Sequence, residues 1–156
     1  MTVTPKAQKL VTDYADRFTN LTPDTLDHLM ELVAPEVRFS DPFHKVRGKA
    51  AFQTIFTHMF ETTSDPKFII SDIAYSTTND TEVAYLRWRM TAHTKGWPSI
   101  ALVFEGMSEV HIGNNALITA HIDHWDSASQ LLSGLPLIGA LIRPIMRLFQ
   151  IKSLRG

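Results

Sequence analysis

The chain of 156 residues contains no cysteine. This absence excludes disulfide bonds, thiol catalysis, cysteine-ligated zinc and iron–sulfur clusters, and it is compatible with a reducing compartment. No apolar run of signal-peptide length occurs between Met1 and Gln8, so the sequence gives export no support. We therefore expect a cytoplasmic protein.

Acidic residues are absent after Asp126. The basic residues that follow this position are Arg143, Arg147, Lys152 and Arg155. The other 11 basic residues and all 16 acidic residues lie in residues 1–126, which carry a net charge of −5, whereas the whole chain carries −1. The near-neutral total argues against general nucleic-acid binding, and we expect no nucleic-acid partner.

The composition is that of a globular protein with one domain. With 44% apolar and 20% charged residues, the chain differs from disordered, collagen-like and multi-span membrane proteins. Its length provides for one core and is too small for two domains of ordinary size.

The basic C-terminal tail has apolar residues at helical spacing, interrupted by Pro144. Its apolar stretch Gly134–Phe149 contains two arginines and is too short to span a bilayer comfortably. Two interpretations follow, and they are compatible. The tail folds back to close a pocket or extend a dimer contact, or it makes a peripheral contact with an anionic membrane surface.

Helices are predicted in the first third of the chain. Thr4-Pro5 is a start signal, and the apolar residues that follow recur at helical spacing as far as Phe18, with Tyr14 on the buried stripe. Thr22-Pro23 opens a second, short helix that ends near Pro35.

A brief strand and a third helix come next. The strand is predicted at Val37–Ser40, before the turn at Asp41-Pro42. The third helix begins after Arg47-Gly48, carries Phe56 on its apolar stripe, and ends before Pro66.

From residue 67 onward the hydrophobic period changes to two, which indicates long strands. The predicted strands of an antiparallel meander are Phe68–Ser76, Glu82–Thr94, Ser99–Ile112 and Ala116–Trp125. Helices followed by strands indicate an α+β fold in which the helices pack on one face of the sheet.

Strand parity predicts which side chains face the helices. Alternate residues of the second and third long strands form apolar rows, and these rows include Trp88, Phe104 and Ser108. Neither row of the last strand is purely apolar. If its Thr119 row faces inward, His121 and Asp123 are polar groups inside an apolar cavity.

Four sequence features occur in a characteristic order: Tyr14 on the first helix, Phe39-Ser40-Asp41-Pro42 at the strand end, Arg47-Gly48 before the third helix, and the closing His121-Ile122-Asp123-His124-Trp125-Asp126. In this order they resemble the nuclear transport factor 2-like superfamily, especially its SnoaL-like and ketosteroid-isomerase-like branch. The resemblance covers roughly residues 5–126. It implies a cone-shaped, strongly curved antiparallel sheet packed on three N-terminal helices, with a deep pocket at the open end.

The same resemblance implies the organisation of the chain. We expect a SnoaL-like domain over residues 1–126 and a C-terminal amphipathic helical tail over residues 127–156, packed on the same domain. The family commonly dimerises through the outer face of the sheet, so we expect a homodimer.

The resemblance also implies catalytic residues. Tyr14 and Asp41 match the tyrosine and the aspartate base of ketosteroid isomerase. Ser108 stands where that enzyme has its second acid, which argues against steroid isomerisation as such. His121 and Asp123 resemble the polyketide-cyclase and epoxide-hydrolase branches, which implies that Asp123 is an acid or base and His121 its orienting partner.

The residues predicted to bind the ligand are Ser108, Trp88, Phe56, Phe104 and Trp125. No cofactor is expected, and no metal, because parity places no second histidine beside His121 and Asp123. His44 follows Asp41 in a loop that borders the predicted pocket mouth. Structural interpretations stay open: a buried tyrosine at Tyr14, a turn aspartate at Asp41, and a polar pair that fixes the last strand.

The functional hypothesis is a pocket protein that binds a small, largely apolar molecule and performs acid/base chemistry on it. The reaction classes are isomerisation, cyclisation, hydration and dehydration. The alternative is a non-catalytic ligand-binding or membrane-associated accessory protein. The resemblance does not decide between them, because the superfamily includes both enzymes and non-catalytic members.

Overall fold

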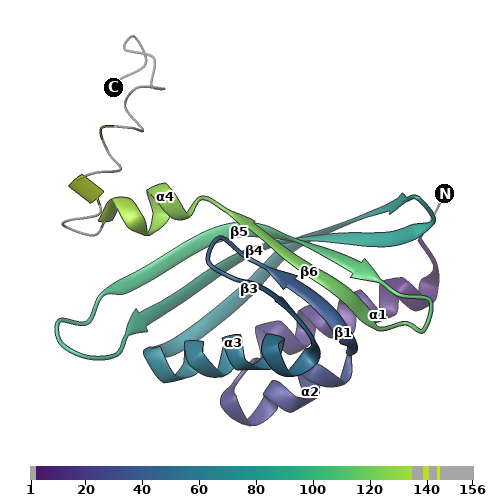
Figure 1. Cartoon of the computed structure of the whole chain (residues 1–156), viewed down its shortest axis with the longest axis horizontal. Helices are drawn as coiled ribbons and strands as arrows, with labels where there is room; N and C mark the ends of the chain where they lie inside the picture. Colours follow the sequence, from purple (N-terminus) through teal and green to yellow (C-terminus); the bar gives the residue numbers. More distant parts are fainter. Residues whose placement is uncertain (1–2, 135–138, 141–143, 145–156) are drawn as a thin grey trace. The chain divides into compact units, whose positions relative to one another are not determined.

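The computed structural model describes residues 3–134, 139–140 and 144, which belong to two units, Met1–Trp125 and Asp126–Gly156. In the first unit the helices precede the long strands (Figure 1). Its elements are, in order, α1 (Pro5–Thr19), η1 (Pro23–Thr25), α2 (Leu26–Glu31), β1 (Val33–Ser40), β2 (Lys45–Arg47), α3 (Lys49–Thr62), β3 (Thr63–Thr78), β4 (Thr81–Thr94), β5 (Ala101–Ile112) and β6 (Ile118–Trp125).

Helix α1 begins at the predicted start signal. The Thr4 hydroxyl accepts a hydrogen bond from the backbone N–H of Ala7, and Pro5 occupies the first helical turn, where its missing N–H costs nothing. The predicted stripe is buried, and Tyr14 has no exposed surface. The helix therefore carries its tyrosine into the core.

Strand β1 starts earlier than predicted. Helix α2 ends at Glu31, and the strand already includes Val33 and Pro35. The pairing of β1 with β6 is irregular between Val33 and Arg38, so Pro35 interrupts no regular ladder of hydrogen bonds. A proline that was expected to end a helix instead lies in a strand.

The six strands form one sheet in the order β2-β1-β6-β5-β4-β3. Four of the five pairings are antiparallel, and β1 and β6 run parallel, which departs from the purely antiparallel expectation. The curled sheet holds the helices on one face (Figure 1). The predicted α+β architecture with N-terminal helices is thus confirmed.

The inward rows of β4 and β5 follow the predicted parity, with Leu86 and Ser108 buried side by side. On β6 strict alternation fails. His111 pairs with Ala120 and Ile112 pairs with Ile118, so the strand has an irregularity at Thr119. This bulge allows Ile118 and His121 to be buried on one strand, although they are three residues apart.

The second unit contains α4 (Ser127–Gln130) and η2 (Leu132–Gly134). Asp126 caps α4 by accepting a hydrogen bond from the backbone N–H of Ser129. Most of the predicted amphipathic stripe after residue 134 lies outside the described residues. In the part of the chain that is described, no helix is long and apolar enough to cross a membrane.

Candidate functional site

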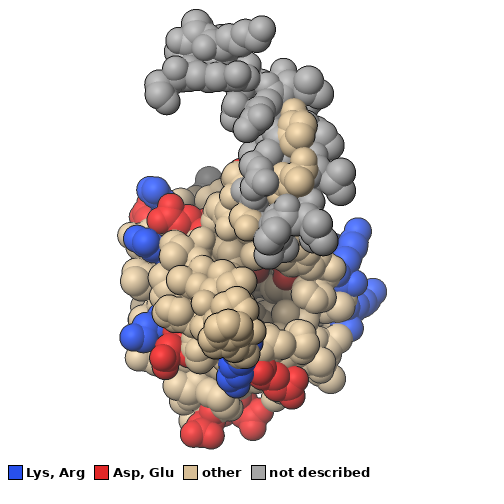
Figure 2. Space-filling model, turned by 90° about the vertical axis from the view of Figure 1, so that its left-hand side faces the viewer, with Lys and Arg blue, Asp and Glu red and all other residues tan. Residues whose placement is uncertain are grey.

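A cavity of about 260 Å³ lies in the first unit between the inner sheet face and helices α1 and α3. Its walls are mainly apolar, and the aromatic residues among them are Phe18, Phe39, Phe56, Phe68, Trp88, Phe104 and Trp125. Figure 2 shows the hollow from outside, with acidic atoms visible within it. Ligand pockets commonly measure about 300–1,000 Å³, so this cavity suits a small molecule.

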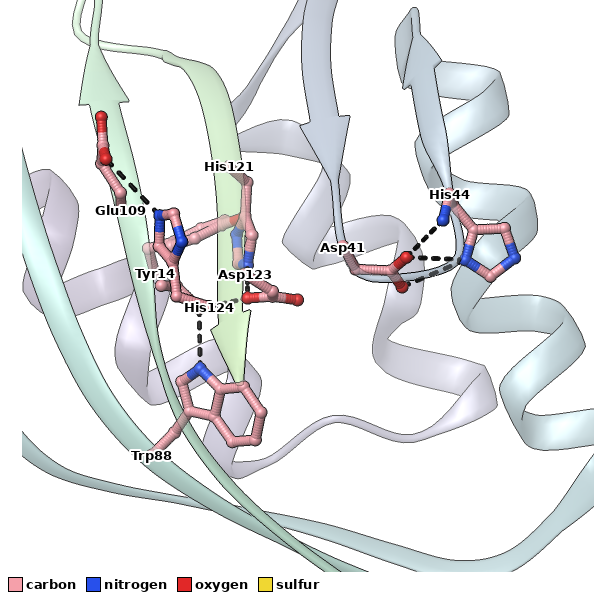
Figure 3. Close-up of polar contacts among 9 residues, drawn as sticks. Tyr14, Asp41, His44, Trp88, Glu109, His121, Asp123 and His124 are labelled. Carbon is pink, nitrogen blue, oxygen red and sulfur yellow. Dashed lines mark hydrogen bonds and ion pairs between the residues drawn. The ribbon is translucent and has the colours of Figure 1, made fainter. Parts of the chain in front are cut away.

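Five side chains form a continuous chain of hydrogen bonds that runs from the wall of this cavity into the core behind it (Figure 3). Trp88 Nε1 donates to Ser108 Oγ over 2.8 Å, and Ser108 Oγ donates to Asp123 Oδ1 over 2.5 Å. His121 Nε2 lies 2.8 Å from the same Asp123 oxygen. On the far side of its ring, His121 Nδ1 lies 2.9 Å from the Tyr14 hydroxyl.

Trp88 and Tyr14, at the two ends of the hydrogen-bond chain, determine where its protons lie. The Trp88 indole can only donate, so Ser108 accepts there and passes its own hydrogen to Asp123. Burial raises the pKa of Tyr14 well above its usual value of 10.0, and the charge of Asp123 raises it further. Tyr14 therefore keeps its proton and donates to His121 Nδ1, which leaves the His121 proton on Nε2, facing Asp123.

Both branches of hydrogen bonds therefore converge on Asp123 Oδ1. Two donors on one oxygen fix the orientation of the carboxyl group. Among the described residues, no group donates to Asp123 Oδ2, and the side chain is 18% exposed. The site thus presents a fixed carboxylate with one oxygen available to accept a proton from a bound molecule.

Aromatic rings hold His121 in place. Its ring centre lies 5.6 Å from that of Phe18, 5.5 Å from Phe39 and 5.7 Å from Phe52. The residue is only 4% exposed. The orientation of the imidazole is consequently set by packing as well as by its two hydrogen bonds.

Asp41 lies in the turn between β1 and β2. Its Oδ1 accepts hydrogen bonds from the backbone N–H groups of Phe43 and His44, at 2.8 and 2.5 Å. His44 Nδ1 lies 3.0 Å from both carboxylate oxygens. Asp41 is therefore a turn aspartate that also lines the cavity, together with His44.

Eight of the nine predicted site residues line the cavity, and Tyr14 is the exception. Tyr14 lies behind His121, so its hydroxyl contacts the histidine and lies apart from Asp41. The link from Trp88 through Ser108 to Asp123 was missed from the sequence. The signal for it is the register of β5 and β6, in which Ser108 and Asp123 are direct partners.

In the described part of the chain, no three His, Asp or Glu side chains lie close enough together to hold a metal ion. On the outer sheet face, His111 Nε2 lies 2.5 Å from Glu109, and His124 lies 3.6 Å from the other Glu109 oxygen. This contact is separate from the cavity.

Comparison with known proteins identifies the family. Residues 11–121 match the model of the SnoaL-like domain. The chain belongs to the SnoaL-like domain family. No curated protein matches the chain.

Solved structures have the same fold as this SnoaL-like domain at low sequence identity. An NTF2-like protein of unknown function from Exiguobacterium sp. 255-15 has a TM-score of 0.63 at 18% identity, and the match covers 75% of this chain and 98% of that one. A protein with a ketosteroid isomerase-like fold from Catenulispora acidiphila DSM 44928, in complex with trimethylamine, has a TM-score of 0.63 at 19% identity, over 86% and 96% of the chains.

A third structure with this fold is the epoxide hydrolase/cyclase-like enzyme SalBIII, which has a role in pyran ring formation in the polyether salinomycin. Its TM-score is 0.62 at 11% identity, over 78% of this chain and 91% of that one. These neighbours confirm the fold of the SnoaL-like domain, and at such identity they carry no residue roles.

Proposed function

We propose that this SnoaL-like protein binds a small, largely apolar molecule in the cavity and that Asp123 exchanges a proton with it. The observation that carries the proposal is the asymmetry of the carboxylate: Oδ1 accepts from Ser108 and His121, and Oδ2 has no donor among the described residues. A fixed carboxylate beside apolar walls is suited to acid/base chemistry.

Each member of the hydrogen-bond chain has a distinct role in this proposal. Asp123 is the acid or base. His121 and Ser108 donate hydrogen bonds to its Oδ1, and by fixing the carboxyl group they also fix the direction of Oδ2. Tyr14 and Trp88 are positioning residues one step further out, since they contact His121 and Ser108 respectively. The reaction classes that need only such a group are isomerisation, cyclisation, hydration and dehydration.

The experiment is a ligand-observed NMR screen with polycyclic and terpenoid compounds. Wild type is compared with Asp123→Asn, which retains the shape of the side chain and removes its charge. The matched control is Asp80→Asn, because Asp80 is exposed in the β3–β4 turn, far along the chain from the cavity residues of β6. Asp80 has a φ of 59°, a conformation that asparagine adopts readily.

We expect compounds that bind wild type and Asp80→Asn alike, and whose binding or conversion changes in Asp123→Asn. Conversion is followed by incubating each bound compound with protein and analysing the products by mass spectrometry and NMR. If no compound binds wild type, or if binding and conversion ignore the Asp123 substitution, the proposal is wrong.

Non-catalytic ligand binding is the alternative: if compounds bind at Asp123 and stay unchanged, the binding part of the proposal stands and the proton exchange is wrong. The homodimer through the outer sheet face stays a prediction. That face carries the exposed apolar residues Ile69, Val103 and Met107.

Membrane contact through the tail also stays a prediction, because most of the tail lies outside the described residues.

A further inference from the structure

The charge of the cavity is one-sided. Its described lining residues include Asp41 and Asp123 and contain neither lysine nor arginine. Arg89, on the outward row of β4, lies 3.7 Å from Glu105 on the neighbouring strand. Low-dielectric apolar walls concentrate the field of such carboxylates, so the cavity is expected to attract positive charge.

Most hydrogen-bond donors at the cavity wall are already in use, and the exceptions are the Trp125 indole N–H and the largely exposed His58 ring. The polar hydrogens of Trp88, Ser108 and His121 are committed within the hydrogen-bond chain, whose two branches converge on Asp123. The Thr62 and Thr63 hydroxyls donate to backbone carbonyl oxygens of helix α3, at 2.8 and 2.7 Å. Apart from the Trp125 and His58 donors, the polar atoms left for a ligand on these described walls are chiefly acceptors, above all Asp123 Oδ2.

His44 agrees with this description. Its Nδ1 lies 3.0 Å from both oxygens of Asp41, so the Nδ1 hydrogen is committed to that carboxylate. A ligand carboxylate or carbonyl oxygen thus meets few free donors among the described lining side chains, and no lysine or arginine. An anionic group of a ligand would also lie in the field of the Asp41 and Asp123 carboxylates.

We infer that the cavity accommodates an apolar molecule that carries a protonated amine, with its N–H groups donating to Asp123 Oδ2. The amine supplies the positive charge that the described walls lack in the form of lysine or arginine, and its N–H groups are donors for Asp123 Oδ2. Aromatic faces add to the attraction for a cation, and Trp125 and Phe104 line the cavity with ring centres 4.7 Å apart. The inference rests on the proposed function, because the same carboxylate holds the ligand, and it adds the ligand's charge.

Three probes of similar size and different charge test this inference. They are 2-naphthylmethylammonium, 2-naphthalenemethanol and 2-naphthoate, and their dissociation constants are measured by isothermal titration calorimetry at neutral pH. A hydrogen bond to a charged group is worth enough to change affinity about 10- to 100-fold. We expect the ammonium to bind wild type tighter than the alcohol by that factor, and the carboxylate to bind weakest.

Two substitutions locate the effect. Asp123→Asn is expected to remove most of the ammonium's advantage and to change the alcohol little. Asp41→Asn is expected to reduce the advantage partly, since an asparagine Oδ1 still accepts the turn amides of Phe43 and His44. Asp80→Asn is the control with the same loss of charge. Thermal unfolding checks that Asp123→Asn is folded. If it is not, the relative affinities of the three probes for wild type and for Asp41→Asn still test the inference.

The outcomes separate this inference from the proposed function. If the alcohol binds and the ammonium binds no tighter, or the carboxylate binds tightest, the inference is wrong and ligand binding stands. An ammonium advantage that survives Asp123→Asn also overturns it. If none of the three probes binds, the binding proposal fails for ligands of this size, and the inference fails with it.

Discussion

Replacing Tyr14 by phenylalanine removes one oxygen from the buried end of the hydrogen-bond chain. The Tyr14 hydroxyl donates to His121 Nδ1 over 2.9 Å, and both residues are almost fully buried. Phe18, Phe39 and Phe52 surround the imidazole, so water has no ready access to replace the lost donor. The variant leaves an acceptor nitrogen without a partner in an apolar environment.

The cost follows from that unpaired nitrogen. Leaving a buried donor or acceptor unsatisfied costs about 1–3 kcal/mol of the free energy of unfolding. For a chain of this length, each kcal/mol lowers the melting temperature by about 2–4 °C. We therefore expect Tyr14→Phe to melt about 2–12 °C below wild type. The loss should also appear in the His121 ¹⁵N chemical shifts, because Nδ1 loses its hydrogen bond.

Urea denaturation and calorimetry measure the free energy of unfolding, and Tyr85→Phe is the matched control. Tyr85 is half-buried, and its hydroxyl makes no hydrogen bond to a described residue. Its removal should change stability by about 0.5 kcal/mol or less. If Tyr14→Phe is as stable as Tyr85→Phe, and the His121 shifts are unchanged, the assignment of the chain and its proton positions is wrong.

Three further outcomes are expected. Because folding raises the pKa of Tyr14 above 10.0, its stabilising effect is complete below that pH and declines as pH rises through the folded value. The stability difference between wild type and Tyr14→Phe in urea denaturation should thus be constant below pH 10.0 and shrink as pH rises above it, and a widening difference would contradict this. Gly106→Ala should destabilise the sheet by about 1–3 kcal/mol and shift tryptophan fluorescence. Its Cβ would lie 2.7 Å from the His124 carbonyl oxygen and 2.8 Å from Trp88 Cζ2, whereas Gly134→Ala, the control, meets nothing within 4 Å. Equal stability of these two variants would refute the packing. The hydrogen bond from His111 lowers the pKa of Glu109 below 4.5, so Glu109 stabilises the fold above that pH and loses the effect as pH falls through its folded value. Glu109→Gln should be less stable than wild type near neutral pH and equal to it in acid, and a difference that persists in acid would count against the assignment.

Much of the fold could be predicted, because local patterns determine it. The period of apolar residues in α1 and α3 follows from helix geometry, and the cap at Thr4 follows from hydrogen bonding within four residues. The alternation in β4 and β5 correctly predicted the buried row that contains Leu86 and Ser108. These features depend on neighbours in the sequence, and they need no knowledge of distant contacts.

The candidate site was only partly predictable. Parity placed His121 and Asp123 together on one row of the last strand without deciding whether that row faces inward, and in the structure both line the cavity. The same parity missed the bulge at Thr119, because a bulge is a property of two paired strands. Tyr14 was expected to contact the ligand, and the structure places it behind His121, since the depth of a helix against a sheet is set by packing across the core.

The sequence by itself determined which residue types are available: no cysteine, a polar pair on an apolar strand, and a basic tail after an acidic body. Only the tertiary structure decided how they act together. Tyr14 and His121 are 107 residues apart, and Trp88 and Ser108 are 20 apart, so their hydrogen bonds exist only once the helix and strands have packed. The resulting hydrogen-bond chain leaves one Asp123 oxygen without a donor among the described residues, because folding has directed the neighbouring donors to the other oxygen.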